Sequence, residues 1–201
     1  IGSLIIPDDL NSDKFLNRSV VIGPGGNTLC EYDKINLFQA NLPTGEVYKE
    51  ANDFESGGTV CILKLNDFCF GLSICFDLRF PELYRLLRNH GANVLLVPSA
   101  FTEHTGSAHW LPLLQARAIE NGSYVIAAAQ VGQHNKGYPR RSYGHSVVIS
   151  PWGEIMSIND SGQDGVTFAD IDRLKIRQAR ANIDSTPRLS TLDLKTDTVE
   201  A

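Results

Sequence analysis

Three short apolar runs in the middle of the chain alternate with two helix-like segments, and this alternation constrains the fold most. The runs are "FCFGLSI" at 68–74, "NVLLV" at 93–97 and "YVIAAAQ" at 124–130. Between them, 81–90 begins with a proline and has leucines at helical spacing, and 107–122 has an apolar face and ends in glycine. A strand–helix–strand–helix–strand order predicts parallel strands joined by right-handed crossovers.

Hairpin patterns flank this parallel unit. Pro24-Gly25-Gly26 separates two β-rich runs, Asn66-Asp67 separates 59–65 from 68–74, and Pro151-Trp152-Gly153 lies between "GHSVVIS" and "EIMSI". Hairpins pair antiparallel, so the pattern predicts a mixed sheet. "IGSLII" at the start predicts a further strand, "GVTFAD" at 165–170 another, and "DRLKIRQARANI" a short helix.

Composition excludes several classes of protein. With 201 residues, 42% of them hydrophobic, the chain can bury one sizeable core. A net charge of −5 without a basic cluster argues against nucleic acid and anionic membrane as partners. No apolar run approaches the roughly 20 residues that span a bilayer. The four cysteines lack zinc-site spacing, so we expect reduced thiols, no metal and a cytoplasmic location.

Cys75 is the first candidate for chemistry. It ends a predicted buried strand and precedes a helix whose first turn is Arg79 to Glu82. Free backbone N–H groups at that point favour a thiolate, and the N–H of Phe76 offers an oxyanion site. The alternative is an inert core thiol.

A cysteine nucleophile needs a base and a positive group near the developing oxyanion. Lys34, in "EYDKINLF", is a candidate for the positive group, and a lysine reaching from a strand end to solvent is the alternative. Four carboxylates follow Lys34 in the sequence and, taken alone, predict a solvated surface: Glu46, Glu50, Asp53 and Glu55.

Five segments, in order, resemble the nitrilase-like carbon–nitrogen hydrolases. "GLSICFDLRFPELYR" is similar to the family's Gly-x-x-Ile-Cys-Tyr-Asp-x-Arg-Phe-Pro-Glu motif, and "YDKINLF" to its Tyr-x-Lys-x-His-Leu-Phe motif. "VPSAFTEHTGSAHW", "RAIENGSYVIAAAQ" and "YGHSVVISPWG" resemble later segments. The departures are Phe76 for tyrosine, Asn36 for histidine and Ala51 for serine.

The resemblance implies a fold and a site. The family fold is a four-layer αββα sandwich with mixed sheets, which we expect over a domain at 1–189, followed by a polar tail at 190–201. By position, the nucleophile falls on Cys75, the oxyanion-stabilising lysine on Lys34, and the family's second glutamate on Glu50. The family needs no cofactor.

The family's base glutamate has no counterpart in this sequence. It is expected in a strand-to-helix segment before Ile1. The chain opens on Ile1 and its single methionine is Met156, so we expect a longer protein whose N-terminal part is missing here.

Within the family, "SAFTEHTG" and "YGHS" resemble the amidase branch that contains deaminated-glutathione amidase and omega-amidase, and are closer to the former. This implies hydrolysis of a linear amide in a small carboxylate-bearing substrate, with release of ammonia through a thioester. Arg140 and Arg141, with Lys136, form a hypothetical carboxylate clamp, against an exposed polar loop as the alternative. Arg79 and His145 are further candidates for substrate binding.

Other functions stay open. One is nitrile hydrolysis by the same nucleophile, and another is a papain-like pairing of Cys75 with His109 or His145. A third is a catalytically inactive member that serves as an assembly or interaction module, because the base is absent. Family members pair through the helices after Cys75 and after His109, so the resemblance implies a homodimer or a higher homo-oligomer.

Overall fold

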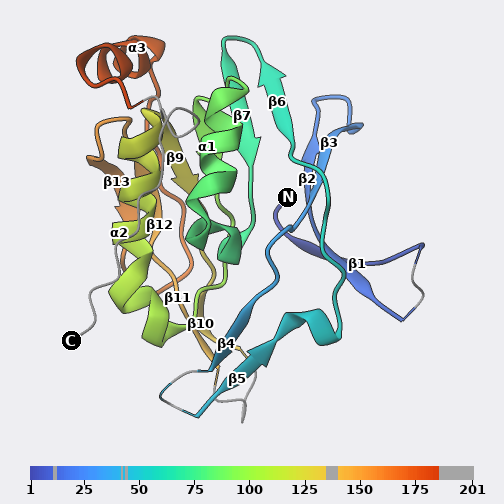
Figure 1. Cartoon of the computed structure of the whole chain (residues 1–201). Helices are drawn as coiled ribbons and strands as arrows, with labels where there is room; N and C mark the ends of the chain where they lie inside the picture. Colours follow the sequence, from blue (N-terminus) through green and yellow to red (C-terminus); the bar gives the residue numbers. More distant parts are fainter. Residues whose placement is uncertain (11–12, 42, 44, 135–139, 186–201) are drawn as a thin grey trace, which may run out of the picture.

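A mixed six-stranded sheet forms the centre of the computed structural model, which describes residues 1–10, 13–41, 43, 45–134 and 140–185 (Figure 1). In spatial order its strands are β13 (Ile155–Asn159), β12 (Ser146–Ile149), β9 (Tyr124–Ala127), β8 (Val94–Leu96), β7 (Phe68–Leu72) and β6 (Ile62–Leu65). Strands β7, β8 and β9 pair in parallel, and the other pairs are antiparallel. The predicted mixed sheet is confirmed.

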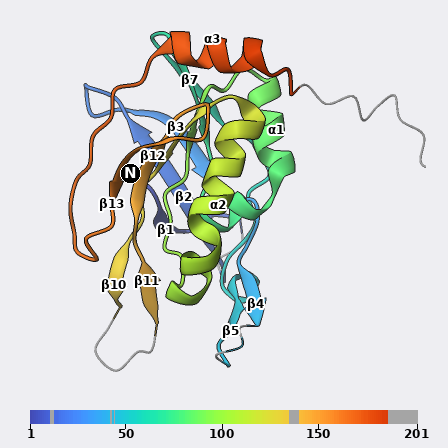
Figure 2. The same cartoon turned by 90° about the vertical axis from the view of Figure 1, so that its left-hand side faces the viewer.

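Two helices cover one face of this sheet (Figures 1 and 2). In α1 (Pro81–Asn89), the proline occupies the first helical turn, where its missing N–H costs nothing, and Leu83, Tyr84 and Leu87 are buried. In α2 (Glu103–Asn121), the Thr102 side chain caps the start and Gly122, at φ 52°, ends the helix. Their buried side chains and the central strands form the largest apolar core.

A second, three-stranded sheet packs against the opposite face of the large one. It consists of β1 (Leu4–Pro7), β2 (Phe15–Ile22) and β3 (Thr28–Asp33), all antiparallel. Tyr32 of this sheet packs with Leu72 and Ile74 of the large sheet. A disulfide joins Cys30 to Cys61, so the expectation of reduced thiols is wrong for this pair, whereas Cys69 and Cys75 are free.

Two small hairpins extend from the same end of the molecule in both views (Figures 1 and 2). One pairs β4 (Gln39–Asn41) with β5 (Val47–Lys49) and continues into a short 3₁₀ helix, η1 (Glu50–Asn52). The other pairs β10 (Val131–Gln133) with β11 (Arg141–Tyr143). A second 3₁₀ helix, η2 (Cys75–Arg79), connects β7 to α1.

The described residues form three layers of the expected αββα sandwich, helices on a sheet on a sheet, and none of them forms a helical layer over the outer face of β1–β3. One predicted strand differs from the structure. The predicted strand at 165–170 is wrong, because this segment forms no strand and pairs with none within the described chain. Helix α3 (Arg173–Asn182) follows it as predicted. The polar tail predicted at 190–201 lies outside the described residues.

No helix in the described part of the chain is both long and apolar enough to cross a membrane.

Candidate active site

A cavity of about 820 Å³ lies at the carboxyl ends of the parallel strands. This edge is where open α/β sheets bind ligands, because helix starts and strand-end loops meet there. The β4–β5 hairpin and η1 form another part of its wall. Six of the residues predicted from the sequence line this cavity: Lys34, Glu50, Cys75, Phe76, Arg79 and Arg140.

Cys75 sits on a turn rather than on a strand tip. Strand β7 ends at Leu72, two residues before the predicted end at 74, and Cys75 is the first residue of η2. Its φ is 50°, in the left-handed region that costs a side-chain-bearing residue about 1–2 kcal/mol. Its N–H donates to the carbonyl of Pro98 at 2.9 Å, which helps to hold this conformation. Such strain is typical of functional turns.

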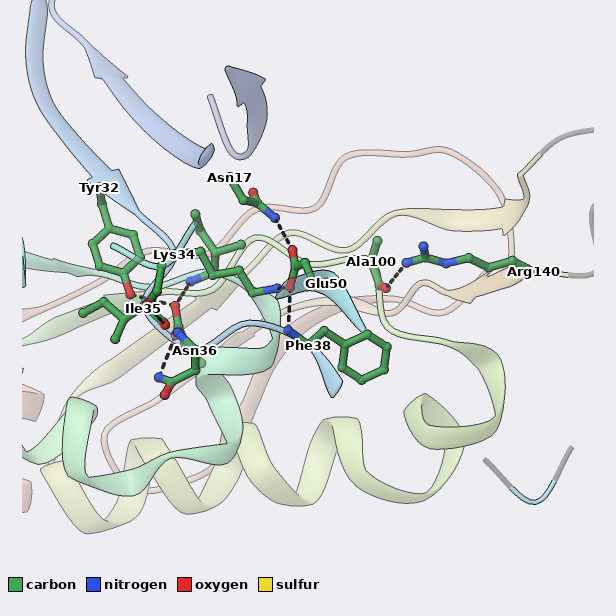
Figure 3. A network of polar contacts seen from close by, with 12 residues as sticks. Asn17, Tyr32, Lys34, Ile35, Asn36, Phe38, Glu50, Ala100 and Arg140 are labelled. Carbon is green, nitrogen blue, oxygen red and sulfur yellow. Dashed lines mark hydrogen bonds and ion pairs between the residues drawn. The ribbon is translucent and has the colours of Figure 1, made fainter. Parts of the chain in front are cut away.

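Lys34 and Glu50 form a buried ion pair on the wall of the cavity that Cys75 also lines (Figure 3). Lys34 Nζ lies 2.5 Å from Glu50 Oε2, and the two side chains are 3% and 14% exposed. The same carboxylate accepts the N–H of Phe38 at 2.5 Å and the amide of Asn17 at 3.1 Å. Burial alone would raise the pKa of Glu50, but the charge of Lys34 and these hydrogen bonds together hold it below its ordinary value.

The Asp77 carboxylate links the Lys34 loop to the Cys75 turn. Its Oδ2 accepts the Tyr32 hydroxyl at 2.7 Å and the N–H of Ile74 at 2.9 Å. Its Oδ1 accepts both the N–H and the side-chain amide of Asn36, each at 2.9 Å. Tyr32 and Asn36 flank Lys34 in the sequence, and Ile74 precedes Cys75.

Arg79 brings a positive charge to the cavity. Its guanidinium lies 5.9 Å from the ring centre of Phe76 and 5.6 Å from that of Phe101, and Nη2 lies 3.3 Å from Nδ1 of His109. Burial lowers the pKa of Arg79, while the nearby Cys75 acts in the opposite direction, and a guanidinium stays charged under such shifts. Among the described residues, no carboxylate forms an ion pair with Arg79.

Arg140 approaches the cavity from the other hairpin (Figure 3). Its Nη2 donates to the carbonyl of Ala100 at 3.4 Å, and its guanidinium lies 5.6 Å from the ring centre of Tyr48. Its Nε is buried without a hydrogen-bond partner in the described structure. Arg140 therefore retains a donor at the cavity wall and also contacts the β4–β5 hairpin.

Two predicted residues lie away from the cavity. Arg141 is half exposed and pairs with Glu103 at 2.6 Å, so it does not act with Arg140 as one clamp. His145 lines a separate pocket of about 150 Å³. Its ring stacks on Tyr143, and its Nδ1 lies 3.0 Å from the carbonyl of Tyr143. Lys136, the third residue of the hypothetical clamp, lies outside the described residues.

A papain-like arrangement is not observed. His109 contacts Arg79, His145 contacts Tyr143, and neither ring is hydrogen-bonded to Cys75 in the described chain. No group of three or more potential metal ligands gathers anywhere among the described residues.

Three residues of this site were not predicted from the sequence: Asn17, Tyr48 and Asp77. Asp77 stands in the nucleophile motif, so its position two residues after Cys75 was an available signal. Asn17 lies on β2, beside the strand that leads into Lys34, and only the pairing of β2 with β3 brings it to Glu50. Local sequence carries no signal for such a contact.

Comparison with known proteins gives the same family as the motifs. Residues 2–181 match the model of the carbon-nitrogen hydrolase family. The "Deaminated glutathione amidase" of Dictyostelium discoideum is 47% identical over 181 residues, which cover 89% of this chain and 60% of that protein. The "Omega-amidase NIT2" of Pongo abelii is 34% identical over 91% of this chain and 64% of its own.

The fold has close structural neighbours as well. The crystal structure of the C. elegans NitFhit protein superposes with a TM-score of 0.86 and 37% identity, over 100% of this chain and 49% of that one. The chain thus spans about 60% of its Dictyostelium relative and half of the NitFhit chain.

Proposed function

The chain belongs to the carbon–nitrogen hydrolase family, and from this premise we propose that its cavity hydrolyses the linear amide bond of a small carboxylate-bearing substrate. The observation that supports this most is geometric. A free cysteine on a strained turn and a buried lysine–glutamate pair face one cavity. Relatives named as amidases support the choice of an amide.

Cys75 is the nucleophile in this proposal. Its sulfur attacks the amide carbon, and the C–N bond breaks after proton transfer to nitrogen, which gives ammonia and a thioester. Water then cleaves the thioester, which gives a carboxylic acid and restores the thiol. The family's further glutamate, which no residue of this sequence matches, takes the proton of the thiol and passes it to the leaving nitrogen; in the second step it takes a proton from water and returns it to the sulfur.

Lys34 and the N–H of Phe76 stabilise the oxyanion. Glu50 is suited to hold Lys34 rather than to accept protons, because its carboxylate already accepts hydrogen bonds from Lys34, Phe38 and Asn17. The pair therefore delivers a fixed positive charge to the developing negative oxygen.

Arg79 binds the carboxylate of the substrate, with Arg140 as a second donor. Both arginines line the cavity, and a charged guanidinium without a carboxylate partner in the described chain is well suited to bind a carboxylate of a ligand.

We also propose, on the family resemblance alone, that the protein forms a homodimer. Sedimentation at two protein concentrations tests this.

Ammonia release from a small dicarboxylate monoamide tests the reaction, with the protein as it is made in the cell. We expect turnover that Cys75→Ala abolishes and Cys69→Ala preserves, because Cys69 is the other free cysteine and does not line the cavity. His145→Ala should retain most activity, whereas Lys34→Ala should lose it. Turnover that survives Cys75→Ala would overturn the proposal.

Two further outcomes separate the alternatives. Ammonia from the matching nitrile but not from the amide would favour nitrile hydrolysis. Absence of turnover on every amide and nitrile, together with stable self-association, would favour an assembly module.

A further inference from the structure

Lys34 and Cys75 line the same cavity but follow strands of two different sheets. Lys34 follows β3 of the three-stranded sheet, and its hydrogen bonds in the described chain are to residues between 17 and 57: its N–H donates to the carbonyl of Asn17, its carbonyl accepts from the N–H of Gly57, and its ammonium pairs with Glu50. Cys75 follows β7 of the six-stranded sheet and is held by Pro98. Their separation therefore depends on how the two sheets are fixed to each other.

Two other features join the sheets. The apolar contacts among Tyr32, Leu72 and Ile74 are non-directional. The Cys30–Cys61 disulfide is covalent, but it involves neither the Lys34 loop nor the Cys75 turn. A shift of about 1 Å between catalytic groups can cost 10²-fold in rate, so a directional link at this point has a large effect on catalysis.

We propose that Asp77 is that link: a positioning residue that fixes the Lys34 loop against the Cys75 turn. The inference rests on the proposed function of Cys75 and Lys34. Asp77 is fully buried, at 0% exposure, and stands two residues after Cys75. Its carboxylate accepts hydrogen bonds from residues two before and two after Lys34, and from the residue before Cys75.

The pattern of donors separates this role from simple capping. Capping of η2 needs the bond from the N–H of Ile74 alone. The three remaining bonds all come from Tyr32 and Asn36 on the lysine side. A carboxylate with four donors is strongly oriented, because hydrogen bonds to a charged group are about twice as strong as neutral ones.

Two tyrosines give a matched test. Tyr32 and Tyr84 are 1% and 0% exposed, and each hydroxyl makes one close contact to a side chain, with Asp77 at 2.7 Å and with Ser73 at 2.8 Å. Tyr32→Phe and Tyr84→Phe each remove one buried hydroxyl, and Tyr32→Phe should lower the melting temperature more, because its bond is to a carboxylate. Only Tyr32→Phe weakens the link to the lysine loop.

We expect Tyr32→Phe to lower kcat roughly 10-fold with KM within about 2-fold, and Tyr84→Phe to leave kcat within about 2-fold. Asp77→Asn should lower kcat on the order of 10²-fold, because its amide nitrogen cannot accept a hydrogen bond. If Asp77→Asn fails to fold, the comparison of kcat between Tyr32→Phe and Tyr84→Phe still tests the proposal. Equal changes in kcat for the two tyrosine variants would overturn the proposal.

A second readout does not need turnover. Iodoacetamide reacts when the Cys75 sulfur bonds to its CH₂ carbon and iodide leaves, and Lys34 can hold its amide oxygen in place during this step. The labelling rate of Cys75 should therefore depend on the placement of Lys34, and mass spectrometry can follow Cys75 against Cys69 as internal reference. We expect Tyr32→Phe to slow labelling of Cys75 roughly 5-fold relative to Tyr84→Phe. Equal labelling rates would overturn the positioning role, whereas retained turnover in Cys75→Ala would instead overturn the proposed function.

Discussion

The cavity wall holds two sets of charged groups that differ in their partners. Lys34 and Glu50 are buried and paired with each other. Arg79 and Arg140 have hydrogen-bond or ring contacts but no ion pair to a carboxylate in the described chain. The lysine–glutamate pair is complete before a ligand arrives, which suits chemistry, and the two arginines lack an anion, which suits recognition.

Glu50→Ala should have the largest effect, because it leaves the buried ammonium of Lys34 without its partner. We expect the free energy of unfolding to fall by about 3–5 kcal/mol, measured by urea denaturation at pH 7. The matched control is the double variant Lys34→Met with Glu50→Leu, which should recover much of that stability. A loss below about 1 kcal/mol in Glu50→Ala would mean that the ion pair does not hold Lys34 in place.

Arg79→Gln should leave stability nearly unchanged and weaken recognition. A hydrogen bond to a charged group contributes about 1.5–3 kcal/mol, so we expect KM for a dicarboxylate monoamide to rise roughly 10- to 100-fold. The methyl ester of the same compound is the control substrate, and its KM should change little. Equal loss on both substrates would assign Arg79 a structural role in the turn.

The stability that the Lys34–Glu50 pair contributes should also fall in acid. The pKa of Glu50 is lower in the folded protein than in the unfolded chain, so the unfolded chain takes up the proton first as the pH falls. This contribution to stability is present above the ordinary glutamate pKa of about 4.3 and is lost as the pH falls through the folded value. Denaturation curves from pH 7 to pH 3 should show a weaker decline in Glu50→Gln than in the wild type. Identical slopes would contradict the shift.

Arg141→Ala should have the smallest effect of the series. Its pair with Glu103 is about half exposed, and pairs of this kind contribute about 0–1 kcal/mol. Activity and melting temperature should both stay close to the wild type, whereas Arg140→Ala should raise KM. A rise in KM for Arg141→Ala as large as that for Arg140→Ala would restore the two-arginine clamp.

These neighbouring arginines show how far sequence reasoning reaches. Arg140 and Arg141 are chemically equal in the sequence, and only the pairing of β11 with β10 sends one to the cavity and the other to Glu103. The central strands and helices were predictable because their periodicity and their Pro81 and Gly122 boundaries are local signals. The segment at 165–170 has the composition of a strand but no partner strand among the residues that the structure describes, and pairing is a long-range property.

The residues of the site were predictable from local motifs, but the contacts between them were not. Lys34, Glu50 and Cys75 were identified through motif resemblance, and the structure gathers all three on one cavity. Their cross-links through Asn17 and Asp77 were not predicted, because they join segments whose distance along the chain says nothing about contact.

The left-handed backbone conformation at Cys75 places activity and thermal stability in conflict. Glycine, and to a lesser degree asparagine, adopts this conformation at little cost, so the residue that the chemistry requires is not the one that the turn prefers. A laboratory population selected only for heat resistance is therefore expected to drift away from cysteine at position 75. One selected for turnover must keep it, and must recover the lost stability elsewhere in the fold.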